Sequence, residues 1–457
     1  MTGNGGVSWW WQQIGLPEPR AGLDGDLEAD VAVVGGGYTG LWTAYYLKTL
    51  QPDLRVVVLE ARFAGFGASG RNGGWLTNSV TGGRERYARS HGRQAAIDQQ
   101  LALNETVDEV IRVAAAEGID ADIVKGGELN VAYTPAQQHR LEAGYRSGSE
   151  WPGTDLVLLG AAESVARIGV SGTTGGVWHP HCARIHPAKL VRGLAQAAVR
   201  LGVKILEQTV VTEIRPGAAI TDRGVVRATH VLRATEGFTA NLRGEHRRWL
   251  PMNSSMIVTE PLPARLWDEL GWAGRETLGD LAHVYMYAQR TADDRIAFGG
   301  RGVPYRYGSR VDTDGATQPR AIESLTALMH RFFPSIVDVP VTHAWAGVLG
   351  VPRDWTATVG LDPTTGLGWA GGYVGTGVTA TNLAGRTLAD LVLRRDTELA
   401  RLPWVGHCAR KWEVEPLRWL AVQGIYALYQ AADRAEFAGR PTTAPAAKLA
   451  NLIAGRT

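Results

Sequence analysis

Two apolar segments near the start of the chain, residues 31–34 and 55–60, lack the three-and-four spacing of a helix face. Their valine-rich composition is typical of strands that are covered on both faces of a parallel sheet. Residues 38–50, between these segments, have the length and composition of a helix. The pattern predicts a strand, a tight turn, a helix and a second parallel strand.

The predicted turn contains Gly35, Gly37 and Gly40 in the spacing G-x-G-x-x-G. The first glycine permits the turn, the second lets a phosphate approach the backbone, and the third lets the helix pack closely on the strand. The start of the helix attracts an anion through its N–H groups and dipole. Glu60 follows the second strand, twenty residues after Gly40, where a carboxylate binds ribose hydroxyls and repels a 2′-phosphate. The unit predicts FAD or NAD rather than NADP, and the alternative is a glycine-rich turn without a ligand.

A loop rich in Gly, Ala and Ser, "ARFAGFGASGRNGGW" at residues 61–75, follows Glu60 directly. Such a loop brings N–H groups close to a flat ligand, whereas NAD-binding folds usually continue into another strand–helix unit. The loop therefore favours FAD. A second glycine-rich turn, residues 371–377, precedes a stretch with Leu383, Leu388 and Leu391 at helical spacing, so a second turn is expected to lead into a helix.

Composition narrows the classes of function. The 457 residues include 47 basic and 45 acidic side chains without a long run of one sign, which indicates neither a nucleic-acid partner nor a polybasic membrane anchor. No window approaches the roughly 18 apolar residues that span a bilayer, and the N-terminus does not resemble a signal peptide. Cys182 and Cys408 offer no disulfide framework or thiolate metal site. We therefore expect a cytoplasmic protein that acts on small molecules.

Several segments together resemble the glycine oxidase and D-amino-acid oxidase superfamily, and in particular the branch of gamma-glutamylputrescine oxidoreductase. They are "DVAVVGGGYTGLWTAYYL" (30–47), "GASGRNGG" (67–74), "HPHCARIHPAKLVRGLA" (179–195), "VLRATEGFTA" (231–240) and "GGYVGTGVTATNLAGRTLADLV" (371–392). The resemblance implies the α/β class: a glutathione-reductase-like, doubly wound FAD-binding domain with an α+β cap, an antiparallel-sheet substrate domain. It departs in one place, because Glu236 stands before Gly237 where the family has Ala-Thr-Gly.

The resemblance also implies which residues contact noncovalent FAD. Val211 would offer its backbone to the adenine, and the second glycine-rich turn would lie under the flavin pyrimidine, where helix N–H groups stabilise negative charge. The implied cofactor residues are Gly35, Gly37, Tyr38, Thr39, Gly40, Glu60, Ala61, Arg62, Gly67, Ala68, Ser69, Arg71, Asn72, Gly73, Gly74, Trp75, Val211, Ala234, Thr235, Gly372, Gly375, Thr376, Gly377, Val378 and Thr379.

The domain layout is expected to be discontinuous. The FAD-binding domain would comprise residues 1–90, 175–250 and 343–400, and the substrate-binding cap residues 91–174 and 251–342. Within the cap, "VYMYAQR" and "RIAFGGRG" (284–290 and 295–302) predict paired strands. Residues 401–457 predict a helical tail packed on the FAD-binding domain.

The resemblance suggests oxidation of an amine or amino acid, in which the flavin accepts a hydride from the carbon next to nitrogen and an imine forms that water hydrolyses. The amine must react in its neutral form, which aromatic walls would favour by desolvation. Candidate walls are Tyr285, Tyr287, Trp345 and Tyr373, together with Trp75 at the end of the glycine-rich loop, and core packing is the alternative role for each. Arg301 is a candidate for binding a substrate carboxylate, or else a solvated or paired arginine.

His179, His181 and His186 are close in sequence. Prolines break any helical metal-binding face there and no carboxylate pair completes a ligand set, so we expect no metal site. One of these histidines is a candidate acceptor for the substrate ammonium proton. Two alternatives to amine oxidation remain open, a 2-hydroxy-acid oxidase or dehydrogenase and a flavin monooxygenase, and the electron acceptor is either oxygen or another carrier.

Overall fold

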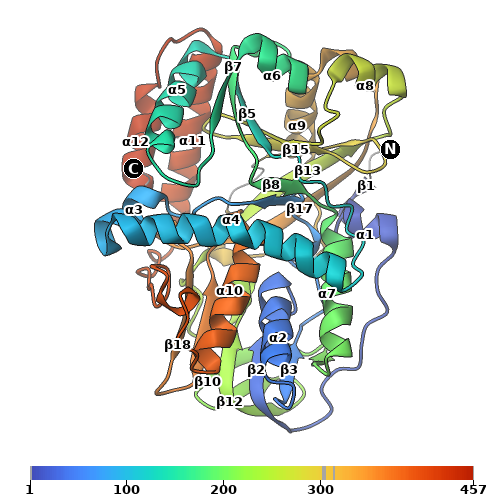
Figure 1. The fold of residues 1–457 in the computed structure, drawn as a ribbon, viewed down its shortest axis with the longest axis vertical. Coiled ribbons are helices and arrows are strands. Elements are labelled where there is room, and N and C mark those ends of the chain that lie inside the picture. Colours follow the sequence, from blue (N-terminus) through green and yellow to red (C-terminus); the bar gives the residue numbers. More distant parts are fainter. Residues whose placement is uncertain (1–2, 301–304, 312–313, 456–457) are drawn as a thin grey trace.

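The structure, a computed structural model, describes residues 3–300, 305–311 and 314–455. Two large sheets occupy opposite ends of the molecule, and the long helix α4 crosses between them (Figure 1). The mixed α/β class expected from the sequence is confirmed. Within the described ranges, no helix has both the length and the apolar character that crossing a membrane requires.

The eight-stranded sheet contains the predicted strand–helix–strand unit. Its main order is β10-β11-β12-β2-β3-β9, and β19 pairs with β12 and β18. Its strands are β2 (Leu27–Val34), β3 (Val56–Leu59), β9 (Lys204–Leu206), β10 (Val211–Arg215), β11 (Ala218–Thr221), β12 (Val225–Arg233), β18 (Thr358–Asp362) and β19 (Leu367–Gly371). Strand β2 lies between β3 and β12 and is parallel to both.

Alternating side chains of β2 enter two different cores. Val31 and Val33 pack in the cluster that includes α2 (Tyr38–Leu50) and α7 (Pro187–Arg200), whereas Ala32 and Val34 pack on the opposite face. A strand covered on both sides reads as a continuous apolar run. This is the physical reason why the sequence pattern was informative here.

The nine-stranded sheet has the order β1-β17-β13-β16-β15-β14-β5-β7-β6. Its strands are β1 (Gly3–Asn4), β5 (Glu128–Ala132), β6 (Val157–Gly160), β7 (Gly175–His179), β13 (Leu250–Thr259), β14 (Thr277–Asp280), β15 (Met286–Arg290), β16 (Ile296–Gly300) and β17 (Val341–Val351). Neighbours are antiparallel except β1 with β17 and β5 with β14. The predicted pairing of β15 with β16 is confirmed.

A small sheet joins β4 (Trp75–Thr77) to β8 (Cys182–Arg184). The remaining helices are α1 (Trp9–Ile14), α3 (Arg84–His91), α4 (Arg93–Ala116), α5 (Pro135–Ser149), α6 (Ala161–Arg167), α8 (Ala264–Leu270), α9 (Pro319–Phe332), α10 (Gly377–Val392), α11 (Leu417–Phe437) and α12 (Pro445–Ala454).

The two sheets divide the chain differently from the expected domain ranges. Strands β7 and β17 fall in ranges expected for FAD binding, but both belong to the nine-stranded sheet. Helix α4 falls in a range expected for the cap, but its Val107 and Val110 pack in the core beneath α2. Helix α4 crosses between the two halves of the molecule (Figure 1), so it packs against both.

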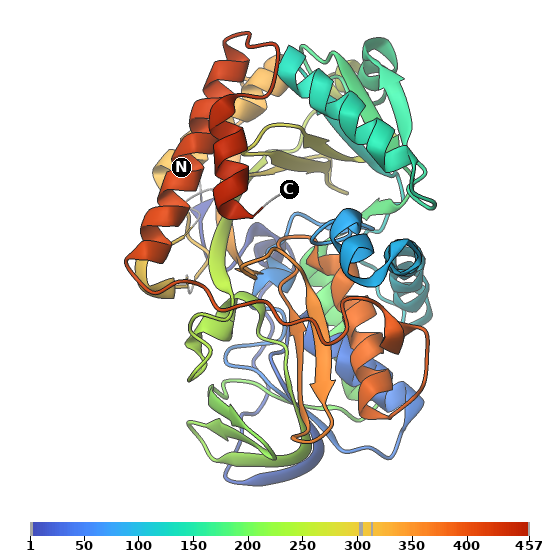
Figure 2. The ribbon, with the colours of Figure 1, turned by 90° about the vertical axis from the view of Figure 1, so that its left-hand side faces the viewer.

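The C-terminal helices pack differently from the expectation. Among the described residues of this tail, those around Leu402 and Trp404 pack with α10. Helices α11 and α12 stand beside the nine-stranded sheet instead (Figure 2), where Glu436 of α11 accepts hydrogen bonds from Arg140 at 2.8 Å and from His283 at 2.9 Å. Asp433 accepts the backbone N–H groups of His283 and Val284. These buried carboxylates need partners that the nine-stranded half supplies.

Candidate FAD-binding site

A cavity opens where β2, β3 and β12 end and where α2 and α10 begin. Carboxyl ends of parallel strands and N-termini of helices are where α/β folds bind dinucleotides. Of the residues predicted to bind the cofactor, those lining the cavity are Gly35, Gly37, Tyr38, Thr39, Glu60, Ala61, Arg62, Gly67, Ala68, Ser69, Asn72, Val211, Ala234, Thr235, Gly375, Gly377 and Val378. Gly40, Arg71, Gly73, Gly74, Trp75, Gly372, Thr376 and Thr379 lie outside this lining.

The first corner of the cavity depends on two glycines. Gly35 has a φ of +111°, and a Cβ atom there would lie 2.5 Å from the carbonyl oxygen of Ala234 at the end of β12. A Cβ atom on Gly40 would lie 2.0 Å from the carbonyl oxygen of Gly35. The corner therefore keeps both its turn and its helix–strand contact only with glycine at these positions.

Glu60 is fixed at one end of the cavity by backbone groups. Its two carboxylate oxygens accept N–H groups from Gly36 at 2.8 Å and from Arg62 at 2.9 Å. Burial raises the pKa of Glu60, although these N–H groups lower it. The carboxylate is thus oriented by the protein itself, and its contact with a ribose stays a prediction.

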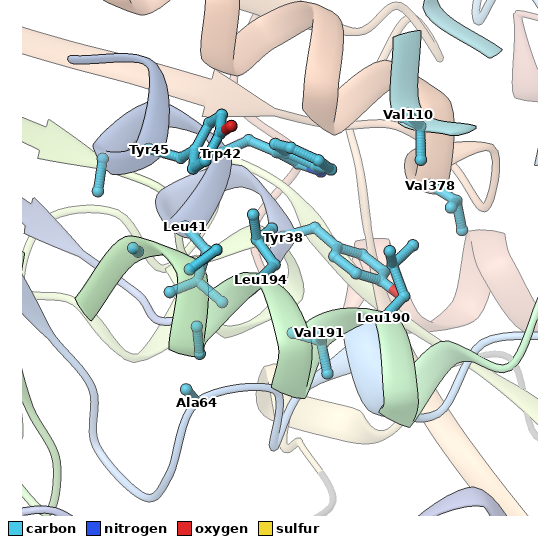
Figure 3. Close-up of a cluster of buried hydrophobic side chains, with 14 of the residues drawn as sticks. Tyr38, Leu41, Trp42, Tyr45, Ala64, Val110, Leu190, Val191, Leu194 and Val378 are labelled. Atoms are coloured by element: carbon cyan, nitrogen blue, oxygen red, sulfur yellow. The ribbon is translucent and has the colours of Figure 1, made fainter. Parts of the chain in front are cut away.

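Tyr38 lines the cavity, and neighbouring segments hold its backbone N–H and its hydroxyl. Its N–H donates to Ser69 Oγ at 2.8 Å, and its hydroxyl donates to the carbonyl oxygen of Pro187 at 2.9 Å. The ring is directed toward Leu190 in the buried cluster between α2 and α7 (Figure 3). Ser69 thereby holds the glycine-rich loop against the start of α2.

The same loop, residues 65–72, rests on helix α1, which the sequence did not identify as part of the site. Ser8 Oγ donates to the carbonyl oxygen of Gly70 at 2.6 Å, and Trp10 Nε1 donates to that of Asn72 at 2.9 Å. Trp11 Nε1 donates to the carbonyl oxygen of Gly65 at 3.4 Å. In the sequence, a serine before three tryptophans could have indicated a capped helix. Only the fold shows that this helix supports the loop.

Trp11→Ala is expected to destabilise the protein by about 3–5 kcal/mol, as large aromatic deletions in cores do, and to weaken FAD retention because Trp11 is fully buried beneath the loop. Thermal unfolding and the flavin remaining after gel filtration measure the two effects. The control is Trp267→Ala, which removes a buried tryptophan from the other core. Equal flavin loss in both variants would contradict a supporting role for α1.

Arg71 supports the loop and does not line the cavity. Its Nε donates to the carbonyl oxygen of Phe66 at 2.8 Å, and its guanidinium lies 4.4 Å from the centre of the Phe66 ring. The Arg71 carbonyl oxygen accepts Trp345 Nε1 at 2.8 Å. Arg71 thus links the loop to β17.

Glu236 organises the second corner, where the sequence showed only a departure from Ala-Thr-Gly. One carboxylate oxygen accepts the N–H groups of Gly350 at 3.1 Å and Tyr373 at 3.2 Å, and the other accepts that of Gly372 at 2.8 Å. Burial raises the pKa of Glu236 to about 7, although these N–H groups and Arg233 lower it. Its φ of +41° is unusual for a residue with a side chain. Glu236 lines the cavity and joins the ends of three segments.

Among the substrate-side candidates that the structure describes, Tyr373 alone lines the cavity. Its hydroxyl lies 3.1 Å from Thr39 Oγ1, so it bridges the second corner to the start of α2. Burial and the neighbouring Glu236 carboxylate both raise the pKa of Tyr373. Thr376 supports the same turn, because its hydroxyl lies 2.7 Å from Thr81 Oγ1.

The other aromatic candidates do not line the cavity. Tyr287 lies with its hydroxyl 2.7 Å from Ser254 Oγ and its ring edge-on to Trp75, with centroids 6.2 Å apart. Tyr285 directly precedes β15 and is half-buried. Tyr287 and Trp75 therefore contact each other between the nine-stranded sheet and the glycine-rich loop. Arg301 lies outside the described residues.

Trp345 has the core-packing role that was the alternative to a substrate wall. Its side chain is fully buried, with ring centroids 6.5 Å from Trp9 and 6.0 Å from Trp10. The N-terminal strand β1 pairs beside β17 and places α1 over this tryptophan. The sequence pattern gave no sign that residues more than three hundred positions apart would meet here.

The three histidines have separate partners. His181 Nε2 lies 2.6 Å from Asp155, and His179 Nε2 lies 3.5 Å from Glu128. His186 accepts the N–H of Lys189 and caps α7, and burial lowers its pKa to about 4. Among the described residues that line the cavity there is no histidine or cysteine.

The residues present fit FAD. A carboxylate held by backbone N–H groups stands at one end of the lining, and the starts of two helices face the interior. Both helix starts favour negative charge. This donor set matches an extended ligand with an adenosine at one end, a pyrophosphate, and a ring system that gains negative charge at the other.

Comparison with known proteins agrees with this assignment. Residues 30–391 match the DAO family, described as FAD dependent oxidoreductase. The chain is 32% identical over 383 residues to gamma-glutamylputrescine oxidoreductase of Escherichia coli (strain K12), covering 82% of this chain and 86% of that protein. It is 25% identical to glycine oxidase of Geobacillus kaustophilus (strain HTA426), over 82% of this chain and 96% of that protein. The crystal structure of glycine oxidase from Geobacillus kaustophilus superimposes with a TM-score of 0.68 at 21% identity, covering 84% of this chain and 100% of that one.

Proposed function

The chain belongs to the DAO family of FAD-dependent oxidoreductases, and from this premise we propose that it oxidises an amine or an amino acid. The carbon next to nitrogen loses a hydride and the nitrogen a proton, so an imine forms, and water hydrolyses it to a carbonyl compound and the remaining amine. FAD, when bound noncovalently, supplies the two-electron acceptor at its N5 atom. The names of the relatives support a nitrogen-containing substrate.

The observation that carries this proposal is the lining of the cavity, which starts at Glu60 and ends at the N-terminus of α10. Gly35 and Gly37 would leave room for the pyrophosphate, and Glu60 would accept the ribose hydroxyls. Gly377 and Val378, at the start of α10, would stabilise negative charge with their N–H groups and the helix dipole. The adenine contact of Val211 is part of the same proposal.

The surroundings of the second corner favour a neutral amine. Tyr373 is buried at this corner, and the Glu236 carboxylate in the same lining is already occupied by the N–H groups of Gly350, Gly372 and Tyr373. Protein groups that exclude water disfavour the charged form of an amine and so favour the form that can lose a hydride.

The proposal extends to the surroundings of the enzyme. The electron acceptor is oxygen or another carrier, and the location is the cytoplasm, supported by two free cysteines, one buried and one exposed.

The test is anaerobic reduction of the flavin by a substrate panel. We expect amines or amino acids to bleach the yellow holoenzyme, while glycolate, lactate and NADPH leave the absorbance unchanged, and readmitted oxygen then shows whether peroxide forms. The panel contains putrescine derivatives, glycine, sarcosine and longer amines. Bleaching by the hydroxy acids alone, or oxygen consumption only with NADPH, would replace amine oxidation by one of the alternative reactions.

A further inference from the structure

Two groups of opposite electrostatic character meet at the second corner of the FAD cavity. Glu236 lines the cavity together with Gly375 of the second glycine-rich turn and Gly377 at the start of α10. The N-terminus of α10 carries the positive end of a helix dipole, whereas Glu236 brings a carboxylate. The proposed function puts the flavin ring system at this corner, where the ring system gains negative charge on reduction. The helix favours that charge and an ionised Glu236 opposes it.

The Glu236 carboxylate also occupies N–H groups that belong to the corner itself. Gly372 and Tyr373 of the second turn donate to it at 2.8 and 3.2 Å, and Gly350 of β17 donates to it at 3.1 Å. Donors that point at this carboxylate are less able to stabilise negative charge on a ligand. An ionised Glu236 therefore disfavours a negative ligand in two ways, through its own charge and through the donors that it occupies.

The charged and titratable neighbours of Glu236 come from β12 and from the second turn. Burial raises the pKa of Glu236 to about 7, although Arg233 of β12 lowers it. Arg233 has other partners, because its Nη1 lies 3.6 Å from Glu245 and its guanidinium lies 4.5 Å from the centre of the Trp249 ring. Burial and Glu236 raise the pKa of Tyr373. Near neutral pH, the charge that changes at this corner is therefore that of Glu236.

We propose that Glu236 takes up a proton when bound FAD is reduced, so that the protonation of this side chain sets how easily the flavin is reduced. Hydride transfer brings two electrons and one proton to the cofactor and leaves one additional negative charge there. A second proton, taken from solvent, converts the Glu236 carboxylate to the neutral acid and restores the total charge of the corner. The placement of the flavin at this corner rests on the proposed function, but the proton uptake does not depend on which substrate supplies the hydride.

The reduction potential of the holoenzyme, measured without oxygen against a reference dye and with dithionite as reductant, tests the proposal. Glu236→Gln keeps the size of the side chain and cannot ionise. Above about pH 7 the wild type should take up one more proton for each two electrons. Its equilibrium constant for reduction should then fall about tenfold more per pH unit than that of Glu236→Gln, which is about 30 mV for a two-electron couple. Below about pH 6 the two slopes should coincide, because Glu236 is already protonated.

Asp280→Asn is the matched control. Asp280 is buried and its pKa is also raised to about 7, but it lies in β14, outside the lining of the FAD cavity. We expect this variant to keep the wild-type dependence of the potential on pH. Above pH ~8 the flavin of Glu236→Gln should be easier to reduce than that of either protein, by about tenfold in the equilibrium constant, because a nearby negative charge has been removed.

The outcomes separate a role in reduction from a structural role. A purely structural Glu236 would change FAD retention in Glu236→Gln and leave the pH dependence of the potential unchanged. Parallel curves for wild type and Glu236→Gln, or an equal change in Asp280→Asn, would overturn the proposal. No amine enters this measurement, so a steeper wild-type curve in an enzyme whose flavin no amine bleaches would support the role of Glu236 and reject amine oxidation. A wild-type protein that retains no FAD would reject both.

Arg233→Gln gives an independent measurement that leaves the Glu236 carboxylate and its three N–H donors in place. Arg233 lies outside the lining of the cavity and lowers the pKa of Glu236. Its removal should raise that pKa, so the pH above which the potential falls more steeply should move upward. An unchanged onset would contradict the assignment of the additional proton to Glu236.

Discussion

Gly40→Ala is expected to abolish FAD retention and to lower the free energy of unfolding by about 3 kcal/mol or more, in the upper range for overpacked sites. The new Cβ atom would lie 2.0 Å from the Gly35 carbonyl oxygen and 3.1 Å from Val33 Cγ1. The turn and β2 leave no room for this atom, so α2 would be displaced from the end of the strand. The displaced helix would carry its N-terminus away from the cavity. Denaturant unfolding and flavin absorbance of the purified protein measure both effects.

Gly144→Ala is the matched control for this change. Gly144 lies inside helix α5, and a Cβ atom there meets nothing within 4 Å. The same substitution should stabilise the protein by about 0.5–1 kcal/mol, because alanine loses less backbone entropy in a helix. Wild-type flavin affinity in Gly40→Ala would show that close packing at the first corner is not required.

Glu236→Gln is expected to change the pH dependence of stability. The folded pKa of Glu236 is raised from 4.5 to about 7, so between these values the folded protein holds a proton that the unfolded chain has released. Stability contributed by this group is therefore present at low pH and is lost as pH rises through the folded pKa. As the pH rises across this window, the free energy of unfolding of the wild type should fall by about 3 kcal/mol relative to that of Glu236→Gln.

Denaturant unfolding of both proteins at several pH values from about 4.5 to about 8 measures this shift. Comparing the pair removes the contribution of Asp280, whose pKa is also raised to about 7 by burial, because Asp280 is present in both. Glu236→Ala, which leaves the N–H groups of Gly350, Gly372 and Tyr373 without this acceptor, should weaken FAD binding more than Glu236→Gln. A difference in stability that stays constant with pH would show that Glu236 does not titrate in this range.

The secondary structure of the site was predicted correctly where it depends on residues that are neighbours in sequence. The apolar run of β2, the turn and the start of α2 follow each other without interruption, so local sterics and periodicity specify them. The second glycine-rich turn and α10 were recognisable for the same reason. The roles of these residues in binding FAD stay predictions, and the flavin measurements on the variants above test them.

The partners of single side chains could not be predicted where they belong to a distant segment. Tyr38 stands in a recognisable motif and lines the cavity, but its hydroxyl binds the carbonyl oxygen of Pro187. Trp345 was a candidate for the substrate side, with core packing as the alternative, and strand pairing with the N-terminus gives it the packing role. No local pattern reports such contacts.

The sequence by itself determined the dinucleotide corner, the acidic residue after the second strand and the likeness to FAD-dependent oxidoreductases, because each depends on residue types at short, fixed spacing. Only the tertiary structure decided that α1 supports the glycine-rich loop, that Glu236 joins three backbone segments, and that α11 and α12 stand beside the nine-stranded sheet. These features are made by side chains brought together from remote positions, and such contacts depend on how whole helices and sheets pack rather than on the order of neighbouring residues.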